Sequence, residues 1–381
     1  MANKVIGAPG IVPPTPNTNP QSSGKVIPWR RATMLKYELG PVDAVPVATP
    51  HNKVLEGTGF FLGADVEVQA ITAGNAAAVA FKPDAPFSAL TNVTLKDVGP
   101  DLVNVSGYGL YLANLYGGFG QRIPTASVDP LVYHATAGAV ATGGSFRYRL
   151  RVPAAINPRA LIGLLGNQDR AVKLELRTDT APTASLYSVA PTAAPTTYNI
   201  TRHLWYATVP APTDERGRSQ ESVPPFYEAF TTLTELQSES APVSSGTIQH
   251  FLRGIGNTIR FMILMFYDSL GARSDLMIPN RLTFRVGSDP IFSETSAHRR
   301  QIMHQEYGFD APAGVLAYSW MNDFSHDAGF ELGDDWLNTR NVANAQLECT
   351  YPVFVNTPGT LRIVTGSLIV PEGKDLYPYM M

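Results

Sequence analysis

Strict alternation of apolar and polar positions is the clearest pattern in this chain, and it occurs twice. In residues 146–152 four apolar side chains alternate with three arginines, and in residues 281–286 three apolar side chains alternate with two arginines and a threonine. Successive side chains of a β-strand point to opposite faces. Each segment is therefore typical of a strand with one buried face and one exposed face.

A helix signal follows each of these two strands. Asn157 and Pro158 supply an N-cap and a proline for the first helical position, and the leucines at 161, 164 and 165 share one helical face. The second helix is predicted between several caps in residues 293–296 and a glycine at 308. The same strand–helix–strand order in both halves predicts that one β-domain plan is used twice.

Further strand signals run along both halves of the chain. They lie at 59–62, 66–70, 93–95, 172–177 and 204–209 in the first half, and at 259–266, 315–320, 345–355 and 361–370 in the second. Roughly eight strands per half with a helical insertion fits a jelly roll better than a meander. Residues 178–197 are rich in Ala, Pro and Thr, and we expect an exposed loop there because apolar anchors are few.

The length of 381 residues allows two domains, each with its own core. The segment 210–225 carries four prolines and five charged residues, and it is the best candidate for the boundary between the two domains. We predict an extended N-terminal arm at 1–34, a first jelly roll at 35–210, a linker at 211–225 and a second jelly roll at 226–381. The fold class is all-β, with two eight-stranded β-sandwich barrels that each carry a short helical insertion.

The N-terminal arm differs in composition from the rest of the chain. Six prolines lie within the first 28 residues and favour an extended conformation. A short helix could form within residues 29–39. The charge is one-sided, because five basic residues precede Glu38, the first acidic residue: Lys4, Lys25, Arg30, Arg31 and Lys36.

Composition and charge narrow the classes of function that the chain can have. Charged residues are only 16% of the chain, against about 25% in ordinary globular domains, which suggests that neighbouring subunits cover much of the surface. A stable all-β monomer is the alternative interpretation. The net charge of −3 argues against wholesale nucleic-acid binding. Cys349 is the only cysteine, so no disulfide can form within the chain, and its apolar neighbours predict that it is buried.

Motifs for catalysis or cofactor binding are absent from the sequence. It has no Gly-x-Ser-x-Gly elbow, no Walker loop and no Gly-x-Gly-x-x-Gly turn, and we expect no enzymatic activity and no cofactor. The seven histidines are scattered, and His298 and His304 would lie on opposite sides of a helix. The acidic segment Asp323–Asp335 resembles a calcium loop, but Ala328 stands where glycine is needed. We interpret it as a solvated acidic loop, with a bound cation as the alternative, and assign no metal site.

Several segments carry a resemblance to a known family. They are Ser106–Asn114, the RLRVPA sequence of 149–154, the LIGLLGNQDRAVKLELR sequence of 161–177, Pro312–Val315 and Leu361–Ile369. In their order and spacing the chain resembles the major capsid proteins of the tectivirus and adenovirus lineage, and specifically a tectivirus-like phage capsid protein. The resemblance covers the chain from about residue 35. The proline-rich arm departs from it, since tectivirus-type proteins have a more helical, glutamine-rich N-terminus.

The resemblance implies a homotrimer whose six jelly rolls form a pseudo-hexagonal block in an icosahedral virion. Its partners would be neighbouring trimers, minor capsid and vertex proteins and an internal lipid membrane, with no sequence-specific nucleic acid. It would assemble in the host cytoplasm. The N-terminus would lie on the membrane side. We therefore expect an inner-shell or membrane contact through Lys25, Trp29, Arg30, Arg31 and Lys36, since each basic residue contributes about 1 kcal/mol at an anionic surface. The alternative is that the arm clamps neighbouring trimers.

Two other functions fit the sequence less well. A viral receptor- or carbohydrate-binding β-sandwich, like a spike or lectin, would show an exposed aromatic cluster, but Trp29, Trp205, Trp320 and Trp336 are dispersed. A bicupin enzyme would need histidines and a carboxylate in each barrel to hold a metal. The histidines of this chain do not fall in strand-alternating pairs, which disfavours that function.

Overall fold

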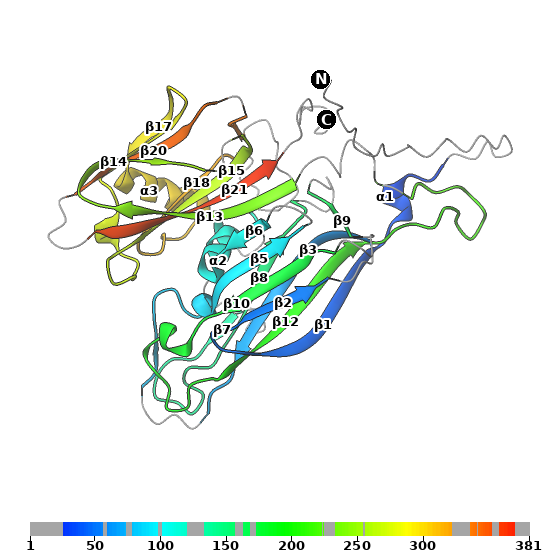
Figure 1. Ribbon diagram of the computed structural model, residues 1–381, viewed down its shortest axis with the longest axis horizontal. Helices are drawn as coiled ribbons and strands as arrows, with labels where there is room; N and C mark the ends of the chain where they lie inside the picture. The colour runs from blue at the N-terminus through cyan, green and yellow to red at the C-terminus, as the bar shows by residue number, and fades with distance from the viewer. Residues whose placement is uncertain are drawn as a thin grey trace, which may run out of the picture.

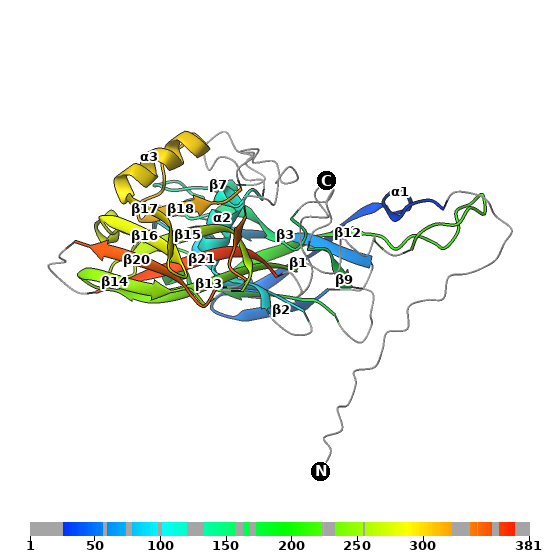
Figure 2. The ribbon, with the colours of Figure 1, turned by 90° about the horizontal axis from the view of Figure 1, so that it is seen from above.

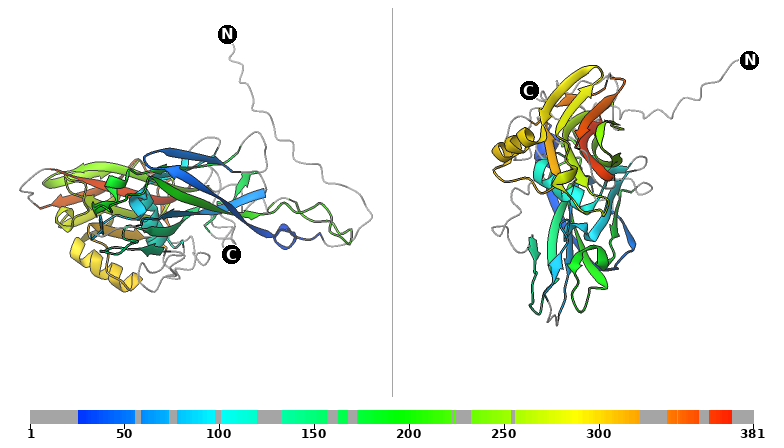
Figure 3. Two further views of the ribbon diagram at one scale, coloured as in Figure 1. Left: turned by 90° about the horizontal axis from the view of Figure 1, so that it is seen from below. Right: turned by 90° about the vertical axis from the view of Figure 1, so that its left-hand side faces the viewer.

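The protein consists of two β-sandwiches, seen in a computed structural model (Figures 1 and 3). The structure describes residues 26–55, 59–73, 78–97, 101–119, 133–156, 163–167, 173–222, 224, 233–253, 256–321, 336–340, 342–352 and 358–369. In Figure 1 the first half of the chain, blue to green, fills the lower part of the view. The second half, yellow to red, lies at the upper left.

Two facing sheets make up the first half. One has the strand order β1 (Leu35–Pro46), β12 (Thr197–Ala207), β3 (Gly59–Ala70), β8 (Phe146–Pro153) and β7 (Tyr133–Ala135), with β9 (Leu165–Asn167) also paired to β3. The other has the order β6 (Asp101–Val105), β5 (Leu90–Lys96), β10 (Glu175–Thr180) and β2 (Pro50–Val54). All of these neighbours within the half are antiparallel.

The second half repeats this construction. One sheet has the order β13 (Leu233–Val243), β21 (Gly359–Ile369), β15 (Thr258–Tyr267) and β18 (Val315–Ser319), with β19 (Leu337–Asn338) also on β15. The other has the order β14 (Gly246–Phe251), β20 (Ala345–Tyr351), β16 (Arg281–Val286) and β17 (Asp289–Thr295). The remaining elements are the short strands β4 (Ala80–Phe81) and β11 (Tyr187–Val189), the 3₁₀ turns η1 (Phe87–Ala89), η2 (Thr183–Ser185) and η3 (Asp275–Met277), and the helices α1 (Trp29–Ala32), α2 (Gly107–Tyr116) and α3 (Ser296–Tyr307).

Both halves have the same topology. When the eight main strands of each half are counted in chain order, strands 1, 8, 3 and 6 form one sheet and strands 2, 7, 4 and 5 form the other. This order is that of a jelly roll. A helix stands between the fifth and sixth strands in each half, α2 in the first and α3 in the second. The prediction of an all-β double jelly roll with one helical insertion per barrel is confirmed.

The two strands that suggested the repeat are not equivalent to each other. Residues 146–153 form the sixth strand of the first roll, whereas residues 281–286 form the fourth strand of the second. Helix α3 agrees with its prediction, with Thr295 as N-cap and Gly308 in a left-handed conformation at its end. Its counterpart is α2, which was not predicted as a helix. All ten residues of α2 are buried, so no amphipathic period marks it in the sequence.

Three local expectations need correction or lie outside the described residues. Residues 157–162 of the other predicted helix are not among the described residues, and Leu165 belongs to strand β9. The helix expected within 29–39 covers only Trp29–Ala32, and β1 starts at Leu35. The segment 178–197 is not wholly exposed, because Leu186 and Tyr187 are buried and the Tyr187 hydroxyl donates to the Gly144 carbonyl at 2.7 Å. Ala181, Pro191 and Pro195 are buried as well, so several short contacts hold this segment against the roll.

The two rolls share a sheet edge. Strands β6 and β13 pair in parallel, with Val103 opposite Leu236 and Asn104 opposite Gln237. This pairing joins the β2-β10-β5-β6 sheet to the β13-β21-β15-β18 sheet, while the strands of each half stay contiguous and do not interleave. We propose the domain limits 35–210 and 226–381 on this basis, with 211–225 as the linker.

Helix α2 lies between the two rolls. It packs on β5 and β8 of the first roll and on β15 and β21 of the second. Glycine is required at position 109, because a Cβ there would lie 2.7 Å from Val105 Cγ2 and 3.2 Å from Val364 Cγ2. At the other end of the helix the rings of Tyr116 and Tyr307 meet edge to face, with centroids 4.8 Å apart. One continuous hydrophobic core therefore spans both rolls.

Each insertion helix also covers an open edge of the sixth main strand of its roll, β8 in the first and β18 in the second. Strand β7 reaches only residue 148 of β8, and beyond it Asn114 of α2 donates to the Arg151 carbonyl at 2.9 Å and accepts from the Arg151 N–H at 2.7 Å. In the second roll, Arg299 Nε donates to the Ala317 carbonyl at 2.6 Å, and the Ala317 N–H lies 3.2 Å from Met303 Sδ. Side chains thus satisfy edge groups that would otherwise be buried and unpaired.

Replacing Asn114 with leucine is expected to destabilise the protein, because it leaves both Arg151 backbone groups buried without partners. Each orphaned group costs about 1–3 kcal/mol. Urea unfolding of the Asn114→Leu variant measures the loss. Asn52→Leu is the matched control, since Asn52 is exposed on β2 and its change should leave the free energy of unfolding nearly unaltered. Equal stability of the two variants would contradict this role for Asn114.

Candidate inter-subunit surface

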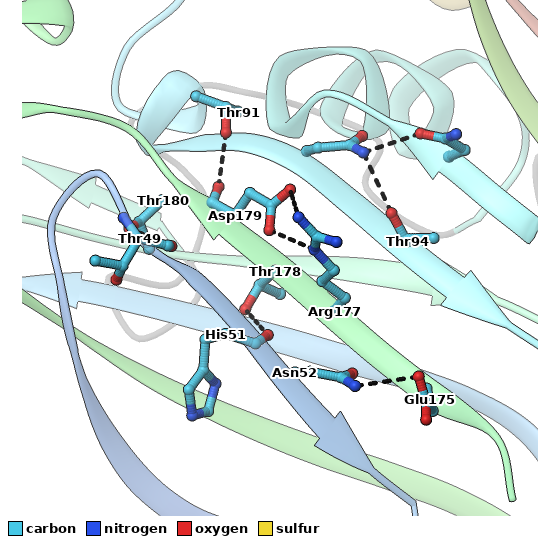
Figure 4. Close-up of polar contacts among 12 residues, drawn as sticks. Thr49, His51, Asn52, Thr91, Thr94, Glu175, Arg177, Thr178, Asp179 and Thr180 are labelled. Atoms are coloured by element: carbon cyan, nitrogen blue, oxygen red, sulfur yellow. Dashed lines mark hydrogen bonds and ion pairs between the residues drawn. The ribbon is translucent and has the colours of Figure 1, made fainter.

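The two sheets of the first roll have outer faces of different character. On the β2-β10-β5 sheet the outer face is polar and exposed: Arg177 donates to both carboxylate oxygens of Asp179, at 2.7 and 3.1 Å, and Asn52 donates to Glu175 at 3.1 Å (Figure 4). Such a face is typical of a sheet surface in contact with water.

The outer face of the β1-β12-β3-β8 sheet, called the β1 face below, combines apolar and charged residues. The strand register sets its cross-strand rows, in which Leu39, His203, Asp65 and Arg151 follow one another across four strands. The face includes Leu35, Tyr37, Leu39, Val42, Thr201, His203, Trp205, Asp65, Glu67, Gln69, Asn199, Arg147, Arg149 and Arg151.

The arginines of the alternating strand lie on this face and are already engaged. Arg147 and Arg149 both bind Glu67, with shortest nitrogen–oxygen distances of 2.7 and 3.2 Å. The Arg151 guanidinium lies 4.1 Å from the centroid of the Trp205 ring, a cation–π geometry. An anion site formed by these arginines alone is therefore disfavoured, because Glu67 already occupies two of them as an ion-pair partner.

Beside the arginines lies a row of buried ionisable groups. Burial raises the pKa of the Asp65 carboxyl, although Arg151 and Arg149 oppose that shift. Burial, together with Arg149, lowers the pKa of His203. The neutral ring of His203 stacks on Tyr37, whose hydroxyl lies 2.5 Å from His203 Nδ1. Tyr37, on the edge strand β1, thus covers the side of His203 that faces the edge of the sheet.

Strand β1, at the edge of the sheet, exposes a line of large apolar side chains. Leu35 is 69% exposed, Leu39 64%, Val42 63% and Tyr37 53%. A free strand edge with contiguous apolar residues is the kind of surface that another chain covers. The adjoining Tyr37, Trp205 and arginines belong to the residue types enriched in interface centres.

Asp65→Asn is expected to raise the midpoint of thermal unfolding at pH 7. The folded state holds the Asp65 proton more tightly than the unfolded state, whose pKa is near the ordinary 3.8. Stability therefore falls as pH rises through the window above 3.8, and asparagine removes that loss. Thermal melts of the variant and wild type should converge below pH 3.8. Asp289→Asn, at an exposed carboxylate, is the control, and an equal gain in both variants would contradict the assignment.

Of the N-terminal residues expected at the inner surface of the shell, the structure describes the side chains of Trp29, Arg31 and Lys36. Trp29 is 1% exposed and meets Phe60 edge to face at 5.6 Å, and its backbone N–H donates to Glu221 at 2.9 Å. Its ring thus anchors the chain in a small core and does not lie on the surface. Arg31 is exposed, and Lys36 Nζ lies 3.6 Å from Glu38. Lys25 and the side chain of Arg30 lie outside the described residues.

Residues 26–34 and 208–221 run side by side and project from the first roll (Figure 2). The Ile27 N–H donates to the Ser219 carbonyl at 3.0 Å, and the Glu221 N–H donates to the Ile27 carbonyl at 3.0 Å. Nearer the roll, the Thr208 N–H donates to the Met34 carbonyl at 2.9 Å. This projection ties the start of the first roll to the linker, a pairing that the sequence did not indicate.

Catalytic and metal chemistry finds no support in the described part of the chain. No group of three His, Cys, Asp or Glu residues there could hold a metal ion, and the acidic segment 323–335 lies outside it. His298 pairs with Glu294 and His304 separately with Asp310.

Cys349 is buried as predicted, and burial raises its pKa to about 12. None of the described helices is long and apolar enough to cross a membrane.

The tryptophans do not form an exposed cluster either. Trp29 and Trp336 are buried, and Trp205 and Trp320 are half-buried. A lectin-like surface of stacked aromatic rings is therefore not present among them.

Two jelly rolls in one chain, joined edge to edge, define the double jelly-roll class. No protein-family model matches the sequence, and no curated protein matches it. Among solved structures, the chain is similar to the major capsid protein of STIV, the Sulfolobus turreted icosahedral virus. The identity is 15% and the TM-score 0.62, and the match covers 89% of this chain and 97% of that one.

Two further capsid structures show the same likeness. Major capsid protein P2 from bacteriophage PM2 has 10% identity and a TM-score of 0.55, over 90% of this chain and 100% of that one. The PBCV-1 virus capsid has 11% identity and a TM-score of 0.56, over 88% and 93%. At these identities the shared property is the fold. The chain has the double jelly-roll fold of viral major capsid proteins, as the resemblance in sequence predicted.

Proposed function

We propose that the chain is a major capsid protein that forms trimeric, pseudo-hexagonal capsomers in an icosahedral virus shell. The observation that carries the proposal is the pair of complete jelly rolls of identical topology in one chain. Capsid structures matched over nearly their whole length support a structural role in a virion and no enzymatic activity.

Physical reasoning supports the trimer. Two similar rolls per subunit, repeated three times, give near-sixfold symmetry, so that one block can pack against six neighbours. The apolar line on β1 supplies a surface for subunits to cover, and many repeated weak contacts stabilise a closed shell. The partners in this proposal are other copies of the chain, neighbouring trimers, and minor capsid and vertex proteins.

The oligomeric state tests the proposal. Three copies of a 41.2 kDa chain make a trimer of about 124 kDa. Light scattering on purified protein at micromolar concentration should give this mass, and electron-microscope images should show a hexagonal outline. A stable monomer under these conditions would count against the capsid function.

We propose in addition that the basic N-terminal segment faces the interior of the shell and contacts an anionic membrane. The exposed Arg31 and the concentration of positive charge before Glu38 support this contact, whereas the buried Trp29 takes no part in it. The projection of residues 26–34 and 208–221 supports the alternative role, a clamp between neighbouring trimers.

Reversing the charges of Lys25, Arg30, Arg31 and Lys36 is expected to weaken binding of the protein to anionic vesicles at low salt. Each basic residue contributes about 1 kcal/mol at such a surface, and salt screens the attraction. Vesicle sedimentation at low and high salt measures the effect, with deletion of residues 1–28 as a second variant. If wild type and variants bind alike at both salt concentrations, the membrane contact is wrong and the clamp remains.

A further inference from the structure

A cleft of about 540 Å³ opens between the two rolls, away from the β1 face. The first roll contributes the turn before η1, the start of β5 and the start of α2. The second roll contributes the end of β15, the turn that follows it and the start of β21, which carries Arg362. Its lining includes Lys82, Ser88, Ser106, Tyr267, Arg273 and Arg362.

The cleft is positively charged in a protein whose net charge is negative. Its charged lining residues are Lys82, Arg273, Arg362 and Asp84, which sum to +2, against −3 for the whole chain. Asp84 is already engaged, because Arg273 donates to it and the Tyr267 hydroxyl donates to it at 3.1 Å. The carboxylate therefore balances the buried Arg273 and leaves the two other cations uncompensated.

Lys82 and Arg362 are the exposed cations of the cleft, one from each roll. Lys82 Nζ donates to the Ala184 carbonyl at 3.1 Å, and the Arg362 guanidinium lies over the Tyr267 ring at 4.8 Å. Neither has a carboxylate partner among the described residues. Both side chains are thus held in place while their charges remain available.

Two further groups in the cleft favour an anion. The N-cap Ser106 and Tyr108 in the first turn of α2 form part of the wall. The start of this ten-residue helix carries partial positive charge. The Ser88 hydroxyl is buried and has no hydrogen-bond partner in the described chain. It is a donor without an acceptor, and a bound oxyanion would supply one.

We infer that this cleft between the rolls is a binding site for an oxyanion, a phosphate or carboxylate group held between Lys82 of the first roll and Arg362 of the second. The site goes beyond the capsid function and does not depend on it. Because the anion contacts both rolls, its binding stabilises their packing, and the folded protein gains stability with anion concentration.

The experiment uses the full chain with inorganic phosphate as the first probe and a tetra-aspartate peptide as the second. Thermal unfolding and calorimetric titration are compared with chloride at equal ionic strength. Phosphate, the peptide or both should raise the unfolding midpoint above the value measured in chloride. The probe that binds more tightly shows whether the site prefers a phosphate or a carboxylate group. Lys82→Gln and Arg362→Gln should each weaken binding about tenfold or more, as expected for one charge-assisted hydrogen bond.

Lys96→Gln is the matched control, because Lys96 is exposed at the far end of β5 and does not line the cleft. It should bind like the wild type. All three variants change exposed side chains, so their melting in chloride should match the wild type and show that the fold is intact. The site is overturned if neither probe shifts the midpoint beyond chloride, or if both cleft variants bind like Lys96→Gln.

Discussion

Tyr37→Asp combined with Leu39→Asp is expected to convert the proposed trimer of about 124 kDa, three times 41.2 kDa, into a monomer. Both residues lie on the exposed edge strand β1, where they are 53% and 64% exposed in the isolated chain. Covering a leucine or tyrosine contributes about 1.5–3 kcal/mol, and burying a carboxylate in its place costs several more. Three interfaces per trimer multiply the loss.

Size-exclusion chromatography with light scattering measures this change. Val189→Asp is the control, because Val189 is also an exposed apolar residue but lies on β11, away from the β1 face. The control should remain trimeric, and the folded state of the double variant is checked by circular dichroism. A double variant that is folded and still trimeric would exclude the β1 face as the subunit contact, while leaving other trimer contacts open to test.

Arg202→Met is expected to destabilise the first roll by about 3–5 kcal/mol, the usual cost of removing one partner from a buried ion pair. Arg202 is 3% exposed and points from β12 into the space between the sheets. Its guanidinium donates to Asp43 at 2.8 Å, to His51 Nδ1 at 2.8 Å and to Thr178 at 2.9 Å. Methionine of similar length would leave all three acceptors without a donor.

Two comparisons separate this network from a simple packing effect. Arg202→Met with Asp43→Asn removes the isolated carboxylate and should recover part of the stability measured in urea. Arg177→Met is the matched control, since Arg177 also pairs with an aspartate, Asp179, but on the exposed face of β10 (Figure 4). Solvent screens that pair, so its loss should hardly change the free energy of unfolding. Equal losses in both single variants would contradict the role of Arg202.

The strands were predictable because their patterns are local. Phe146, Tyr148 and Leu150 are buried while the arginines between them are not, as their alternation indicates. Likewise Thr295 and Gly308 mark both ends of α3 by local backbone chemistry alone. The number of jelly rolls also follows from such signals, together with the resemblance to a capsid lineage.

The equivalence of the two halves was only partly predictable, for a physical reason. Helix α2 is buried on all sides, so its Gly- and Tyr-rich sequence lacks the period that reveals α3. Because the sequence gives no signal for α2, the predicted repeat pairs the strand at 146–152 with the strand at 281–286. These two strands occupy different places in their rolls.

The candidate surfaces depend on contacts between distant segments, which a linear pattern does not contain. The sequence marks Trp29 as an aromatic residue beside two arginines, yet its ring packs on Phe60 and its N–H meets Glu221, 192 residues away. The cleft likewise has both Lys82 and Arg362 in its lining only because the rolls meet there. The sequence shows the charge and type of each of these residues, but it does not show which distant residues they contact.

The parallel pairing of β6 with β13 has a mechanical consequence. Backbone hydrogen bonds and the buried helix α2 connect the rolls at the same place, so a hinge between them would have to break a sheet and open a core. A subunit of this kind deforms as one stiff body. In a closed shell, curvature would then be taken up at the seams between subunits, and the tilt from one capsomer to the next would set the particle's radius.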